Sequence, residues 1–119
     1  MQFELNSDYL DQLKTAIVEK NDEFLKAQLS ELYAVDIALI LNQLDLEDSI
    51  YLYDQIDEEL SSDVLLEMEE EKREALLATF STKEIAEQLD NMDSDDAADV
   101  INELPEEIQE EVLSHIEDI

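Results

Sequence analysis

Large apolar residues recur in this chain at a fixed interval of twelve positions, and this period constrains the fold more than any other feature. Seven successive positions carry such a residue, which is hard to obtain by chance: Leu44, Ile56, Met68, Phe80, Met92, Leu104 and Ile116. The chain is therefore expected to repeat one small structural unit along its length.

Each of these anchor residues follows apolar side chains three and four positions earlier, and Gln88 alone interrupts that set. Apolar residues at this spacing lie on one face of a helix. A helix of about nine residues is only ~13 Å long and is marginal alone, so neighbouring units must stack to bury their faces. We predict an all-α fold, a superhelical stack of short antiparallel helices in twelve-residue half-units, of undetermined handedness.

Composition and capping signals agree with a helical chain. Glycine is absent and Pro105 is the single proline, so the residues that favour tight hairpins are missing. The run Ser81-Thr82-Lys83-Glu84 predicts a capping box, and Pro105 suits a first helical position. The absence of cysteine excludes disulfides and thiolate metal sites.

The length of 119 residues fits a single domain over residues 1–119. Within it we expect helical repeats over 31–119 and two capping helices over 1–30, begun by Asn6 and Asn21. The chain stops with Ile116 still apolar, so we expect further protein to follow it.

The formal net charge of -29, from 35 acidic and 6 basic residues, restricts the possible partners. Nucleic acid and anionic lipid would be repelled, whereas cations and basic protein surfaces would be attracted. No run approaches the ~20 apolar residues of a membrane span, so no direct membrane insertion is expected of this chain.

Four acidic motifs recur along the repeat, and they are Leu44-Asp45-Leu46-Glu47-Asp48, Ile56-Asp57-Glu58-Glu59, Met92-Asp93-Ser94-Asp95-Asp96-Ala97-Ala98-Asp99 and Leu104-Pro105-Glu106-Glu107-Ile108. These motifs resemble the N-domain repeat of MgtE-type magnesium transporters, and the likeness covers the chain from about residue 9 onward. The resemblance implies a regulatory domain at the cytoplasmic face of the cell membrane, in a homodimeric transporter. Its partners would be the CBS domains and plug helix of the same transporter, which lie outside this sequence together with the pore.

The resemblance also implies that cytosolic Mg²⁺ binds weakly between the N and CBS domains and holds the pore closed. By position, the N-domain metal ligands would be Asp63, Asp95 and Asp99, with Asp63 in place of a family Glu. Asp95 and Asp99 lie four residues apart, so their carboxylates share one helix face with Asp96. Mg²⁺ keeps several waters, and one or two carboxylates suffice to hold it. The alternative is that these acids form only a solvated face.

Another function class remains open. Acidic helical hairpins of the flagellar motor switch protein FliG are similar in pattern, and such a module would bind a basic partner with ions acting only by screening. An enzyme finds no support, because the single histidine, His115, is expected on a helix surface. The other acidic runs, such as Glu67 with Glu69-Glu70-Glu71, are expected to be solubilising faces. A calcium-binding EF-hand loop from Asp93 lacks its glycine and has Leu104 where its Glu should be.

Overall fold

The computed structural model describes residues 5–117, with side chains through Ile116, and these residues form helices without any strand. The helices are α1 Ser7–Val18, α2 Asp22–Ser30, α3 Ala34–Gln43, α4 Leu46–Tyr53, α5 Glu58–Glu67, α6 Glu70–Leu77, α7 Thr82–Asp90, α8 Ser94–Glu103 and α9 Glu106–Glu117. The prediction of an all-α stack of short helices is confirmed.

The helix starts follow the twelve-residue period of the sequence. From α2 onward every helix begins twelve residues after the one before it, at Asp22, Ala34, Leu46, Glu58, Glu70, Thr82, Ser94 and Glu106. The period therefore extends one unit further toward the N-terminus than the seven anchors indicated. Leu32, which lies twelve residues before Leu44, is the anchor of this additional unit and packs against the core.

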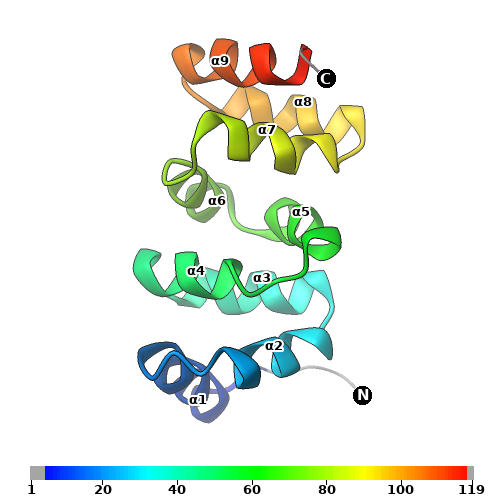
Figure 1. Cartoon of the computed structure of the whole chain (residues 1–119). Coiled ribbons are helices and arrows are strands. Elements are labelled where there is room, and N and C mark those ends of the chain that lie inside the picture. Colours follow the sequence, from blue (N-terminus) through cyan, green and yellow to red (C-terminus); the bar gives the residue numbers. More distant parts are fainter. Residues whose placement is uncertain (1–4, 118–119) are drawn as a thin grey trace.

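The helices form an elongated stack of two rows, with extents of 43 × 28 × 23 Å (Figure 1). Along one row α3 packs on α5, α5 on α7 and α7 on α9. Along the other, α1 packs on α4 and α4 on α6. α1 and α2 contact each other at one end of the stack, and α8 packs on α7 near the other (Figure 1).

One continuous hydrophobic core runs the length of this stack. The apolar pairs that precede the anchors supply much of it, and Leu41, Leu52, Leu65 and Leu77 are all inaccessible to solvent. Full burial of a leucine contributes roughly 1.5–3 kcal/mol, and no single twelve-residue unit could bury its pair alone. Stability therefore comes from contacts between units, chiefly between units two apart along the chain, such as α3 with α5 and α7 with α9.

Leu113 precedes the anchor Ile116 by three positions and was expected on the buried stripe, but it lies at the surface. Leu113 is 41% exposed, because α9 packs mainly on α7 among the described residues and leaves this flank open. Tyr51 is only half-buried, and its hydroxyl donates a hydrogen bond to the carboxylate of Asp22. Tyr51 thus links α4 to the start of α2 as well as packing on the core.

The capping signals are confirmed at three helices. The side chains of Asn6 and Asn21 accept hydrogen bonds from backbone amides in the first turns of α1 and α2. Ser81 and Glu84 form the predicted capping box of α7. Pro105 differs from its prediction by one position, since its carbonyl accepts from the Gln109 amide and α9 begins at Glu106.

Candidate metal-binding site

The three predicted ligands lie on two helices. Asp95 and Asp99 occupy successive turns of α8, and Asp63 lies in the second half of α5. All three side chains are exposed, and their carboxylates form no hydrogen bond or ion pair with other described residues. Each is therefore free to bind a cation or water.

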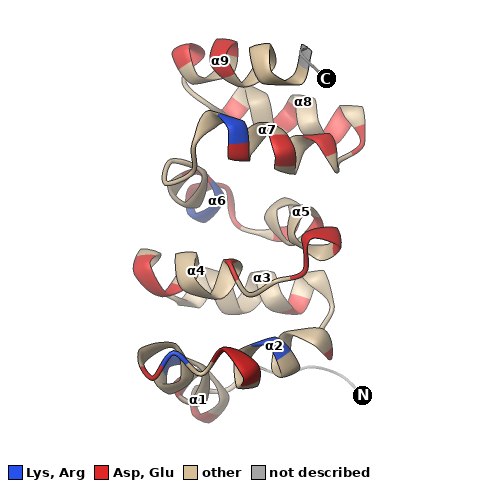
Figure 2. Cartoon of the chain, in the orientation of Figure 1, with Lys and Arg blue, Asp and Glu red and all other residues tan. Residues whose placement is uncertain are grey.

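Internal cations neutralise little of the acidic charge. Acidic residues lie on helices throughout the stack, whereas basic residues are few (Figure 2). Within residues 5–117 a single ion pair forms, between Arg73 and Glu103. Mutual repulsion of the remaining carboxylates opposes compaction unless external cations screen it.

A surface depression of about 610 Å³ lies beside the predicted site and brings acids of α5 and α8 together. Its lining includes Glu67 of α5, Asp96, Asp99 and Glu103 of α8, and Arg73 of α6. Of the three predicted ligands, Asp99 alone borders this depression. Asp95 precedes Asp99 by one turn, and Asp63 precedes Glu67 by one turn, so both lie on the helices that form its walls.

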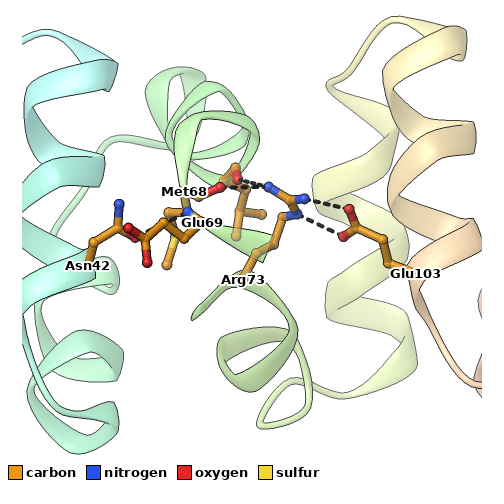
Figure 3. Close-up of polar contacts among 6 residues, drawn as sticks. Asn42, Met68, Glu69, Arg73 and Glu103 are labelled. Carbon is orange, nitrogen blue, oxygen red and sulfur yellow. Dashed lines mark hydrogen bonds and ion pairs between the residues drawn. The ribbon is translucent and has the colours of Figure 1, made fainter. Parts of the chain in front are cut away.

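Arg73 occupies one side of this depression and joins three helices. Its Nε and Nη2 donate to the two carboxylate oxygens of Glu103, at 2.9 and 2.5 Å. Its Nη1 donates to the carbonyls of Leu65 and Met68, at 3.2 and 2.9 Å. Figure 3 shows the guanidinium held between the Met68 carbonyl and the Glu103 carboxylate. The bond to Glu103 raises the pKa of Arg73, so the guanidinium stays protonated.

The start of α6 is also fixed from the opposite side. The backbone amide of Glu69 donates to the side-chain oxygen of Asn42, on α3, at 3.2 Å (Figure 3). With Arg73 reaching α8, these contacts place α5, α6 and α8 relative to one another. The acidic walls of the depression are therefore built on well-connected elements.

A second acidic group adjoins the ion pair of Arg73 and Glu103. Carboxylate oxygens of Glu70, Glu74 and Glu103 lie within 4.8 Å of one another. Among residues 5–117 no other three acidic or histidine side chains come this close together. Since Glu103 is already bound to Arg73, the group offers fewer free oxygens than its count suggests. Asp63, Asp95 and Asp99 form no group of that kind.

Sequence reasoning missed two acids of the depression. Glu67 was expected to belong to a solubilising run, and Glu103 received no role. The spacing of Asp96, Asp99 and Glu103 along α8 was the available signal, because residues at i, i+3 and i+7 share a helix face. No comparable pattern connects Glu67 to α8.

The donor set fits a hard, hydrated divalent cation. Apart from Arg73, the polar side chains that line the depression are all carboxylates, the ligand type that Mg²⁺ prefers. Asp95 and Asp99 are exposed on successive turns, with the small side chain of Ala98 also exposed between them. An ion that keeps several waters could be held here by one or both carboxylates and remain open to a second surface.

No helix among residues 5–117 combines the length and apolar character that a membrane span requires. No curated protein matches the chain. A family model for the MgtE intracellular N domain matches residues 32–118, which is well over half of the 119-residue sequence. The chain therefore belongs to the MgtE intracellular N domain family, whose members are intracellular domains of magnesium transporters.

Proposed function

We propose that this domain senses Mg²⁺ at the cytoplasmic face of the cell membrane and gates the magnesium transporter that carries it. Asp95 and Asp99 are the proposed ligands, with Asp63 as a third. The ion would be shared with the CBS domains of the same transporter, in a homodimer whose plug helix follows those domains. Docking of the acidic domain would hold the pore closed when Mg²⁺ is abundant.

The observation that supports this proposal is a pair of exposed carboxylates on α8 that no basic side chain among the described residues neutralises. Like charges four residues apart destabilise a helix by roughly 0.2–0.5 kcal/mol, and Asp96 adds a third charge to the same turns. A bound divalent cation would supply positive charge that offsets this repulsion and attracts a second acidic surface. Without the ion, two acidic surfaces would separate, which gives the domain a direct electrostatic response to Mg²⁺ concentration.

Family membership is independent support for a role in magnesium sensing. The match spans α3 to α9 and therefore includes both α5 and α8. An intracellular domain of a magnesium transporter is in contact with the pool of ions that the transporter changes. A weak, partly hydrated site is suited to report that pool, because its occupancy then varies over the concentrations that the transporter must control.

Thermal melting in MgCl₂ and in NaCl at matched ionic strength tests the ligand assignment. At ten times its dissociation constant an ion stabilises the folded state by about 1.4 kcal/mol. For a domain of this size that is roughly 5 °C in Tm. We expect this excess in the wild type and its loss in the Asp95→Ala, Asp99→Ala variant.

A matched control is the Glu110→Ala, Glu111→Ala variant, which removes two exposed charges from α9. We expect it to retain the magnesium-specific gain. Equal stabilisation of the wild type by the two salts would contradict specific sensing and favour an interaction module that ions affect by screening alone.

A further inference from the structure

A groove of about 550 Å³ lies on another part of the molecule, between α4 and α5 on one side and, on the other, α7 and the segment between α6 and α7 that holds Thr79 and Phe80. Its volume is within the ~300–1,000 Å³ of pockets that bind ligands. None of Asp63, Asp95 and Asp99 lines it. It is therefore a separate feature from the proposed metal site.

The floor of the groove is aromatic and internally hydrogen-bonded. The rings of Tyr53 and Phe80 lie 5.5 Å apart at an interplanar angle of 42°. The Tyr53 hydroxyl lies 2.8 Å from Oε1 of Gln88 and 3.2 Å from the carbonyl of Ser61. These contacts join α4, α5 and α7 and hold the floor of the groove in place.

The rim of the groove is acidic on both sides. Asp54 and Glu58 contribute from the α4–α5 side, and Glu84 and Glu87 from α7, whereas no lining residue is basic. Glu84 accepts a hydrogen bond from the Ser81 backbone, which lowers the pKa of its carboxyl and keeps it ionised. The groove therefore combines a negative rim with an apolar floor.

An exposed apolar strip on α4 leads into this groove. Leu46 and Ile50 lie on successive turns and are 43% and 38% exposed, and Ile50 also lines the groove. Large apolar side chains exposed side by side in a strongly charged protein mark an interaction surface more often than isolated ones do. The strip and the floor together form a continuous apolar track with carboxylates beside it.

We propose that this track docks an amphipathic, basic helix of a partner protein. Its apolar face would pack on Ile50, Tyr53 and Phe80, and its Lys or Arg side chains would meet the four rim carboxylates. Helix-in-groove recognition uses this combination of an apolar seam with charged flanks. A second copy of the chain is a poor occupant, because each copy carries a net charge of -29 and opposes the other.

Binding of a designed peptide tests the proposal. The probe is a fluorescein-labelled peptide of about 18 residues, with leucines at i, i+3, i+4 and i+7 spacing and lysines elsewhere. Anisotropy is measured with EDTA and about 0.15 M NaCl, so that divalent ions and long-range attraction contribute little. The comparison peptide has the same composition in a scrambled order that destroys the apolar seam. We expect at least tenfold tighter binding of the amphipathic peptide.

Two matched pairs of variants locate the binding. Glu58→Lys with Glu87→Lys changes the rim, and Glu110→Lys with Glu111→Lys makes the same charge change on α9. Ile50→Ser and Leu113→Ser remove apolar side chains of similar exposure, 38% and 41%, inside and outside the track. We expect each track variant to weaken binding at least tenfold and each α9 variant to weaken it less than threefold.

Three results would overturn the proposal. They are equal binding of the scrambled peptide, equal loss in the rim and α9 charge variants, or an unchanged Kd for Ile50→Ser. The first two would indicate attraction by the overall field, and the third would exclude the apolar track. The charge variants and the apolar variants test the proposal separately. If circular dichroism shows that one of them is misfolded, the other still decides the outcome.

Discussion

Replacement of Arg73 by methionine should destabilise the domain more than any other single loss of a basic residue. The side chain of Arg73 is 11% exposed and makes four hydrogen bonds, two to Glu103 and two to backbone carbonyls. A methionine side chain at this position would retain much of the packing but leave the Glu103 carboxylate and the Met68 carbonyl without the Arg73 donor, while the Leu65 carbonyl would keep its bond from the Met68 amide. The chain would also become more negative.

The magnitude follows from how far these groups are buried. Removal of one partner of a buried ion pair costs about 3–5 kcal/mol. Glu103 is 16% exposed and borders the surface depression, so water can rehydrate part of its carboxylate. We therefore expect a loss of about 2–4 kcal/mol, equivalent to roughly 8–16 °C in Tm for a domain of this size.

Urea unfolding followed by circular dichroism measures this loss, with Lys83→Met as the control. Lys83 is exposed, so its replacement changes the net charge equally and breaks no buried contact. Glu103→Gln should cost less than Arg73→Met, because Arg73 would keep its two carbonyl acceptors. The reasoning is refuted if Arg73→Met and Lys83→Met lower the unfolding free energy by the same amount.

Three further substitutions test other contacts. Ser81→Ala removes the side-chain acceptor of the α7 cap and should cost about 1 kcal/mol in urea. The bond from the Ser81 amide to Glu84 remains in this variant; since the folded pKa of Glu84 lies below its ordinary 4.5, the contribution of that bond is present above this pH and is lost as pH falls through the lower value. Tyr53→Phe should cost about 0.5–1.5 kcal/mol, whereas Tyr33→Phe, at a residue 78% exposed, should leave the urea midpoint unchanged. Leu65→Ala opens a cavity at a fully buried position and should cost about 2–5 kcal/mol by the same assay, and a cost below about 1 kcal/mol would contradict the assigned core.

The helices were predictable because one physical requirement repeats along the chain. Each unit must place its anchor and the preceding apolar pair on the same face, so the period of the apolar residues is also the period of the helix starts. The capping residues Asn21 and Ser81 then marked individual starts from their side-chain chemistry alone. Local signals of this kind survive in a fold built from contacts between neighbouring units.

The contacts of Gln88 could not be predicted from local signals of this kind. In the sequence it interrupts an apolar stripe, and nothing nearby explains it. In the structure its Oε1 lies within hydrogen-bond distance of the hydroxyls of Tyr53, Ser61 and Ser62, on α4 and α5. These partners are 26 to 35 residues away, and a periodic pattern carries no information about such a polar network.

The acidic site was likewise only partly predictable from the sequence. The shared face of Asp95 and Asp99 was predictable from their spacing on one helix, whereas the approach of Glu67 to Asp96 and Asp99 depends on how α5 and α8 pack. The role of Arg73 between those helices was equally hidden, because its partner Glu103 lies 30 residues away. Contacts between units that are distant in the sequence cannot be inferred from its period.

The most direct test of magnesium sensing is a titration of the ¹⁵N-labelled domain with MgCl₂ at constant ionic strength, followed residue by residue through backbone amide shifts. We predict saturable shifts that are largest from Asp95 to Asp99 and that disappear in the Asp95→Asn, Asp99→Asn variant. Small, unsaturable shifts spread evenly over the acidic surface, unchanged in that variant, would contradict a specific ion site on α8.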